Sequence, residues 1–142
     1  MGRFQTTVSD FHISCPWDLM EVRKALQHVN HFVSVQQALP DLAEDLDLVL
    51  SEAMTNIVRH GTQDAEGVIE CFLVLEGGGV QCRLTDTGRA FDPSGAGLCA
   101  PEPKTFPEGG YGWFLIRSLT SHLSYAREGN LNVLHFYILR CG

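Results

Sequence analysis

Basic residues are scarce in this chain of 142 residues. Lysine occurs only twice, as Lys24 and Lys104, and the formal net charge is −7 at pH 7. A surface that binds nucleic acid relies on lysine and arginine to neutralise backbone phosphates. We therefore expect no nucleic-acid partner.

Paired-cysteine motifs and long apolar runs are absent as well. The five cysteines are widely spaced and form no CxxC motif, so the sequence predicts neither a disulfide framework nor a zinc site. No stretch approaches the roughly 18 apolar residues of a membrane span. Residues 1–8 have no apolar core like that of a signal peptide. We expect a soluble protein of the reducing cytoplasm, without a membrane partner.

The chain does contain enough apolar residues, 44%, to build one packed domain over residues 1–142. Weak alternation over residues 3–9 suits a short edge strand. Helical spacing of apolar residues predicts a first helix from Pro16 to about residue 33. A second helix is expected from Asp41 to His60, with Gly61 as its cap.

Two hairpins are expected in the rest of the chain. Residues 68–75 and 80–86 alternate on either side of a glycine-rich turn, and a register with Leu75 opposite Val80 places Asp86 at the end of an apolar face. Residues 123–127 and 131–139 read as a second hairpin. The sequence thus predicts an α+β fold, a two-layer sandwich with helices on one face of a mixed, mostly antiparallel sheet.

The expected second helix carries polar residues along the border of its apolar stripe. Glu52, Asn56 and His60 follow one another at intervals of four residues, so their side chains face the same way. Beside a pocket, Glu52 could act as a base or as a water-mediated partner of a metal, and Asn56 could give its carbonyl oxygen to a hard cation. The alternative is a solvated flank of the helix.

Two further stretches carry candidate ligand contacts. Asp86, followed by Thr87 and Gly88, is either a turn former or a ligand contact. Gly109–Gly112 precede a third helix expected at residues 113–119, where free N–H groups favour phosphate, although glycine turns are common. Residues 89–108 are rich in glycine and proline and suit a lid.

Together the three motifs resemble the ATP-binding fold shared by DNA gyrase, the histidine kinases and the MutL mismatch-repair proteins. The motifs are Glu52-x-x-x-Asn56-x-x-x-His60-Gly61, Asp86-Thr87-Gly88-Arg89-Ala90-Phe91-Asp92 and Gly109-Gly110-Tyr111-Gly112. Within that fold, the Ser51–Asn56 run and residues 109–119 resemble the anti-sigma-factor serine kinases of bacterial partner switching. The resemblance covers roughly residues 4 to 139.

The resemblance implies a role for each motif residue. Asn56 would hold the Mg²⁺ that bridges the phosphates of ATP, and Glu52 would be the general base. Asp86 would accept a hydrogen bond from the adenine amino group, with Gly88 giving the base room. Phosphate contacts would come from Gly110, Tyr111 and Gly112, and residues 89–108 would form the ATP lid.

The chain departs from that family pattern at several positions. Some relatives have an arginine just before the glycine motif, where this chain has Glu108; Lys104 and Arg89 are candidates to replace it. Ala90 stands where many ATPases of the fold have a second glycine. Residues 131–134 lack the threonine that often helps to bind adenine.

Three functions fit this sequence. The first is a serine/threonine kinase that transfers the γ-phosphate of Mg-ATP to an anti-anti-sigma antagonist and otherwise binds a sigma factor or another regulator. The second is a nucleotide-gated binding module with little or no kinase activity. The third is a detached histidine-kinase catalytic domain, which the lack of dimerisation helices disfavours. The family tendency suggests a homodimer.

Overall fold

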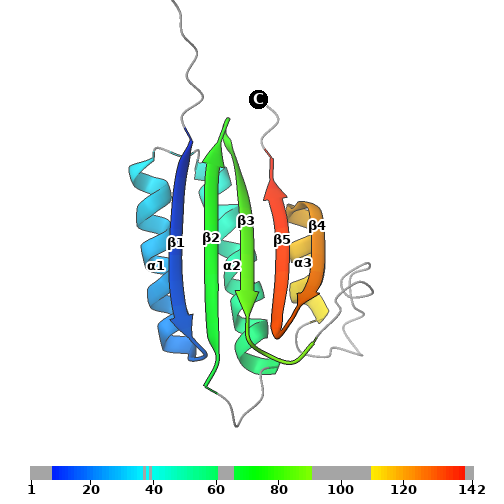
Figure 1. Cartoon of the computed structure of the whole chain (residues 1–142). Coiled ribbons are helices and arrows are strands. Elements are labelled where there is room, and N and C mark those ends of the chain that lie inside the picture. Colours follow the sequence, from blue (N-terminus) through cyan, green and yellow to red (C-terminus); the bar gives the residue numbers. More distant parts are fainter. Residues whose placement is uncertain (1–7, 37, 39, 61–65, 91–109, 140–142) are drawn as a thin grey trace, which may run out of the picture.

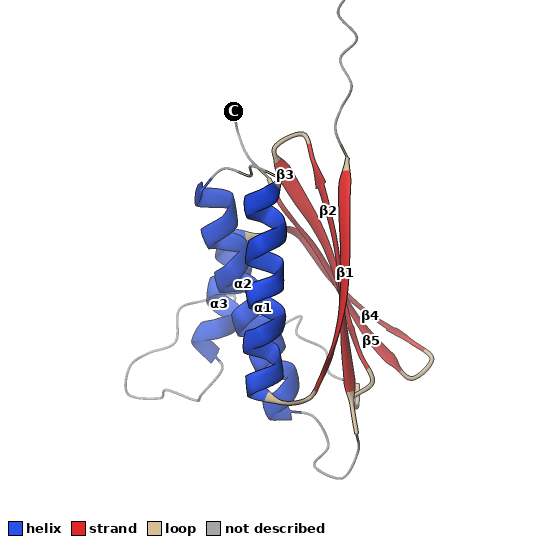
Figure 2. Cartoon of the chain, turned by 90° about the vertical axis from the view of Figure 1, so that its left-hand side faces the viewer, coloured by secondary structure: helices blue, strands red, loops and turns tan. Residues whose placement is uncertain are grey.

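Three helices lie against one face of a five-stranded sheet within the part of the chain that the computed structural model describes, residues 8–36, 38, 40–60, 66–90 and 110–139 (Figure 1). Seen from the side, the helices and the sheet form two separate layers (Figure 2). The predicted two-layer α+β fold is confirmed. None of the helices in these ranges combines the length and the apolar character needed to cross a membrane.

The elements follow the predicted order of one strand, two helices, two strands, one helix and two strands. They are β1 (Ser9–Pro16), α1 (Leu19–Val35), α2 (Pro40–His60), β2 (Val68–Glu76), β3 (Gly79–Asp86), α3 (Gly110–Leu119), β4 (Ser121–Glu128) and β5 (Leu131–Ile138).

The strand order in the sheet is β1-β2-β3-β5-β4, and each neighbouring pair among the described strands is antiparallel. The predicted hairpin register is confirmed, because Leu75 pairs with Val80. At the other end of β3, Asp86 pairs with Ile69 on one side and with Asn132 on the other. The register therefore places two polar side chains next to each other at one end of the sheet.

The apolar stripe of α2 forms the centre of the core. Leu46 and Leu50 are completely buried, and Ala53 is 2% exposed. On the sheet side they meet the inward-facing residues of β2, β3 and β5, such as Phe136. Met54 of the same helix also lies in the core. Helix α2 is therefore held between the sheet and its two neighbouring helices.

The beginning of the chain differs from the prediction. The strand expected at residues 3–9 falls mostly outside the described residues, and the described strand β1 runs from Ser9 to Pro16. Pro16, expected to open the first helix, is instead the last residue of this strand. Helix α1 begins at Leu19 because Asp18, in an extended conformation, accepts hydrogen bonds from two N–H groups of the first turn.

Replacing this cap tests the assigned helix start. In Asp18→Ala the N–H groups of Met20 and Glu21 lose their acceptor, at 2.8 and 3.1 Å from Asp18 Oδ1. We expect the free energy of unfolding to fall by about 1 kcal/mol, measured by urea denaturation. Asp18→Asn keeps an acceptor and should remain close to the parent protein. An equal loss in both variants would contradict the capping role.

Candidate functional site

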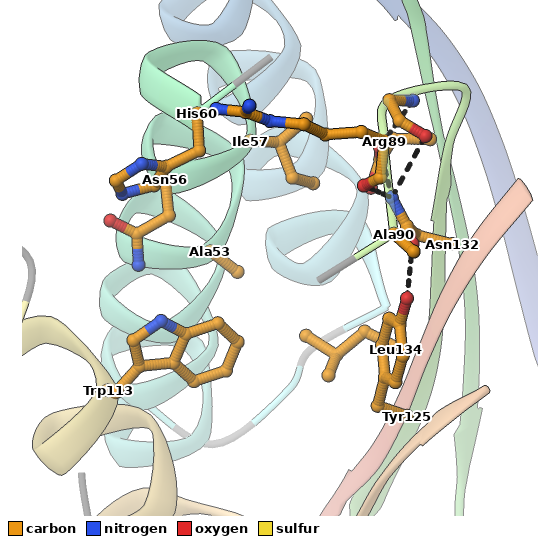
Figure 3. A pocket seen from close by; sticks show the side chains of 12 residues that line it. Ala53, Asn56, Ile57, His60, Arg89, Ala90, Trp113, Tyr125, Asn132 and Leu134 are labelled. Atoms are coloured by element: carbon orange, nitrogen blue, oxygen red, sulfur yellow. Dashed lines mark hydrogen bonds between the residues drawn. The ribbon is translucent and has the colours of Figure 1, made fainter. Parts of the chain in front are cut away.

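A cavity of about 360 Å³ lies between α2 and the neighbouring ends of β3, β4 and β5 (Figure 3). Pockets for small ligands in proteins have volumes of roughly 300–1,000 Å³, so the cavity can take a nucleoside-sized group. Its lining residues are Ala53, Asn56, Ile57, His60, Asp86, Gly88, Arg89, Ala90, Trp113, Tyr125, Asn132 and Leu134.

Asn56 lines this cavity from α2 with a buried carboxamide. The residue is only 5% exposed, and neither its Oδ1 nor its Nδ2 has a hydrogen-bond partner among the described residues. A buried polar group without a partner costs about 1–3 kcal/mol. The position and the unsatisfied oxygen fit a ligand contact, and they fit an oxygen donor for a hard cation such as Mg²⁺.

Glu52 lies one turn earlier on α2 and faces the first turn of α3. A methyl group at Gly112 would stand 2.6 Å from Glu52 Oε2 and 3.7 Å from Asn56 Nδ2. Because glycine has no side chain, the carboxylate and the carboxamide can both approach the beginning of α3. The structure thus brings together Glu52, Asn56 and Gly112, which the sequence predicted as site residues from separate motifs.

Helix α3 begins at Gly110, three residues before the predicted start at residue 113. Gly110, Tyr111 and Gly112 therefore occupy its first turn, where backbone N–H groups have no acceptor within the helix. The side chain of Tyr111 lies outside what the structure describes. Of the predicted lid at residues 89–108, only Arg89 and Ala90 are described, and Lys104 and Glu108 fall outside.

Asp86 contributes a buried carboxylate at the end of β3, as the predicted register required. It is 8% exposed, and its Oδ1 accepts hydrogen bonds from Gly88 N at 2.8 Å and from Asn132 Nδ2 at 3.0 Å. No described residue donates to Oδ2. Since Asp86 lines the cavity, this second oxygen is available to a ligand.

Gly88 also lines the cavity, and its lack of a side chain makes room for protein atoms as well as for a ligand. A methyl group there would meet Asp86 Oδ1 at 2.8 Å and the Trp17 ring at 3.3 Å. The expectation that Gly88 gives a bound base room stays a prediction. The geometry gives a second reason for glycine at this position, because the backbone turns closely around the Asp86 carboxylate.

Asn132, Tyr125 and Trp113 are among the cavity residues that the sequence did not predict as site residues. Asn132 and Tyr125 come from β5 and β4, and their side chains are hydrogen bonded to each other (Figure 3). Trp113 lies in the core, 8% exposed, and it also lines the cavity. The available signal for Asn132 was an amide side chain within the apolar run of residues 131–134.

Arg89 is a cation at the edge of the cavity. Its side chain extends from the sheet side toward the last turn of α2, near Ile57 and His60 (Figure 3). The sequence offered Arg89 as a candidate to replace the arginine that some relatives have just before the glycine motif, and the structure places it on the cavity wall. Whether it contacts a phosphate stays a prediction.

The described cysteines behave as small apolar residues. Cys15, Cys71 and Cys82 are buried and free. Burial, with Glu21 and Asp18 nearby, raises the pKa of Cys15 to about 11. Burial also raises the pKa of Cys82 well above its usual value, with its neighbour Cys71 contributing. These two thiols stay protonated at neutral pH and are not nucleophiles.

Residues 15–138 match the family described as the histidine kinase-like ATPase domain. The chain belongs to this family. The match covers most of the chain and includes the Glu52, Asn56 and Asp86 motifs on which the predicted resemblance rested. The resemblance to this ATP-binding fold is therefore confirmed.

Several curated relatives carry the name serine-protein kinase RsbW. Those of Bacillus thuringiensis (strain Al Hakam), Bacillus cereus (strain AH820) and Bacillus anthracis (strain A0248) are each 28% identical to this chain over 100 residues. These matches cover 66% of this chain and 62% of each relative, so the chain spans less than two thirds of their length. They agree with the predicted resemblance to bacterial serine kinases.

One solved structure supports the fold. The RsbU and RsbW domains of Rv1364c from Mycobacterium tuberculosis align with a TM-score of 0.63 and 16% identity, over 91% of this chain and 32% of that one. At this identity the likeness concerns the arrangement of helices and strands alone.

Alanine substitutions at Gly88 and Gly112 should show which of the two positions requires glycine for lack of space. Gly88→Ala should lower the free energy of unfolding by about 1–3 kcal/mol, because the added methyl group meets the Asp86 carboxylate and the half-buried ring of Trp17. Gly112→Ala should lose less than about 1 kcal/mol, because its close contact is with the far end of the flexible Glu52 side chain, its contact with Asn56 Nδ2 is at an ordinary distance, and alanine favours a helix. Urea denaturation measures both. The reverse ranking would contradict the described turn at Gly88.

Proposed function

We propose that this chain is an ATP-dependent serine/threonine protein kinase. Membership of the histidine kinase-like ATPase family and similarity to proteins named serine-protein kinase support the proposal. The observation that carries it is the buried carboxamide of Asn56, whose two polar atoms have no partner among the described residues. A Mg-nucleotide supplies the missing partner.

The adenine base would occupy the end of the cavity near β3. Asp86 Oδ2, which accepts no hydrogen bond from the described residues, would accept one from the exocyclic amino group of adenine. A guanine base presents a carbonyl oxygen at the corresponding position, which a carboxylate repels. Asp86 would therefore select ATP over GTP, with Gly88 beside the base.

The phosphates would extend from the base toward the first turn of α3. Backbone N–H groups of Gly110, Tyr111 and Gly112 would donate to them, at the positive end of the helix dipole. Asn56 Oδ1 would be the protein ligand of Mg²⁺, and the bound ion would neutralise phosphate charge during transfer. Arg89, on the cavity wall, is the described cation best placed to add positive charge.

Glu52 would serve as the general base. The hydroxyl oxygen of the incoming serine or threonine bonds to the γ-phosphorus, and the bond to the β–γ bridging oxygen breaks, so ADP leaves. The hydroxyl proton passes to the Glu52 carboxylate. The position of this carboxylate next to Gly112, at the helix end assigned to the phosphates, supports the role.

The protein substrate would be a small antagonist of the anti-anti-sigma type, and the alternative partner a sigma factor or a similar regulator. A homodimer is the expected assembly.

Glu108, in place of an arginine, favours a second candidate, a nucleotide-gated binding module with little or no kinase activity. Incubation with Mg-ATP and a cognate antagonist, followed by mass analysis of both proteins, distinguishes them, because only a kinase adds phosphate to the partner.

Asn56→Ala should abolish measurable binding of Mg-ATP, because the cation loses its protein ligand. The same change removes a buried unsatisfied amide, so the free energy of unfolding without nucleotide should fall by no more than about 1 kcal/mol. Calorimetric titration and urea denaturation measure the two effects. Thr55→Ala, on the neighbouring position of α2 and outside the cavity lining, is the control. Unchanged nucleotide affinity in Asn56→Ala would rule out this metal site.

Glu52→Ala should keep Mg-ATP binding and slow phosphate transfer by roughly 10²-fold or more, as expected for loss of a general base. Single-turnover transfer to the antagonist measures the rate, and titration measures the binding. Glu44→Ala removes an exposed carboxylate from the same helix and should leave both unchanged. A full rate in Glu52→Ala would exclude Glu52 as the base.

A further inference from the structure

The side chain of Asn132 sits at the base-binding end of the cavity with every polar atom engaged. The residue is 7% exposed and pairs with Asp86 across β3 and β5. Its Nδ2 donates to Asp86 Oδ1 at 3.0 Å, to Arg89 O at 2.8 Å and to Gly88 O at 3.4 Å. The amino group therefore meets only acceptors.

The carbonyl side of the same amide meets only donors. Asn132 Oδ1 accepts hydrogen bonds from the Tyr125 hydroxyl and from Arg127 Nη1, the latter at 3.2 Å. Arg127 Nη1 also donates to Gly88 O at 2.6 Å. A flipped amide would set oxygen against oxygen and nitrogen against donors, so only one orientation satisfies the surroundings.

This arrangement determines how Asp86 presents its carboxylate. Two donors, Gly88 N and Asn132 Nδ2, hold Oδ1, and no described residue engages Oδ2. Asn132 has no further hydrogen-bonding capacity of its own to offer a ligand, since its hydrogens and its oxygen face protein partners. Its influence on a ligand must therefore pass through Asp86.

We propose that Asn132 is a positioning residue for nucleotide binding. It fixes the Asp86 carboxylate so that Oδ2 remains available to the adenine amino group, and it holds the Gly88–Arg89 backbone beside that carboxylate. This inference rests on the proposed binding of ATP. It assigns base recognition in this chain to an aspartate held by an asparagine rather than to the aspartate alone.

Asn132→Asp gives the sharpest test, because it keeps the shape and replaces the donor with an acceptor. The new carboxylate would face Asp86 Oδ1 and two backbone carbonyls, with Arg127 and Tyr125 on its other side. Two adjacent carboxylates cannot both ionise easily, so the pKa of the pair rises. At high pH the pair repels, and at lower pH a shared proton restores the lost donor.

The readout is the ratio of the ATP dissociation constant of the variant to that of the parent protein, measured by calorimetry at each pH. We expect a ratio of about 10 or more at about pH 8.5 that falls steadily toward about pH 6. Because both proteins bind the same ATP at each pH, the ratio cancels the effect of the protonation of ATP on its dissociation constant. Asn132→Ala, which has no group to titrate, should show a loss of affinity that is constant over this range.

Asn30→Asp is the matched control. Asn30 Nδ2 donates to Asp47 Oδ1 at 3.2 Å between exposed parts of α1 and α2, away from the cavity. The same chemical change next to a carboxylate should leave the ratio within about twofold of one at every pH, since exposed charges interact weakly. Thermal unfolding at each pH confirms that the variants are folded, and Asn132→Ala remains informative if Asn132→Asp is not.

The outcomes separate this inference from the proposed function. If the parent protein does not bind ATP, the proposed function fails. If the parent binds ATP and both Asn132 variants bind it equally well, the positioning role is wrong and ATP binding stands. A loss in Asn132→Asp at about pH 8.5 that is no larger than the loss in Asn132→Ala would also overturn the inference, because the charge added beside Asp86 Oδ1 would then have no effect on ATP binding.

Discussion

The packing of α2 on the sheet is the constraint on which the rest of this structure depends. Leu46 and Leu50 are completely buried, so the rotation of the helix about its axis is fixed. Each residue along a helix turns by about 100°, and a shift of the buried stripe by one position would carry Glu52 and Asn56 away from α3. The position of the polar pair therefore follows from the burial of apolar residues elsewhere on the same helix.

The sequence was sufficient where the signal is local and strong. The long apolar period of α2 and the glycine turn between β2 and β3 predicted both elements and the pairing of Leu75 with Val80. The start of the chain was harder, because Pro16 is favourable at a helix start and also acceptable at the end of an edge strand. The capping geometry of Asp18 decides between these positions, and it is visible only in the structure.

In the candidate site, too, the residues within one local motif could be predicted, whereas a contact between distant strands could not. Glu52 with Asn56, and Asp86 with Gly88, lie within single motifs and could be found from spacing. The bond between Asn132 and Asp86 joins residues 46 positions apart. It depends on β5 lying between β3 and β4, and no local pattern specifies that order. The early start of α3 was missed because glycines have low helix propensity.

The two buried asparagines of the cavity show how its ends differ. Asn132 is saturated by partners from β3, β4 and the Gly88–Arg89 segment, so the end that carries Asp86 is already formed without a ligand. Asn56 has no such partners among the described residues, and its burial costs stability until something binds. A ligand that contacts Asn56 recovers this cost and stabilises the fold by mass action. Under the proposed function, the base of a nucleotide would contact the end that carries Asp86, which is already formed. The phosphates and their cation would contact Asn56 and supply the partners that it lacks among the described residues.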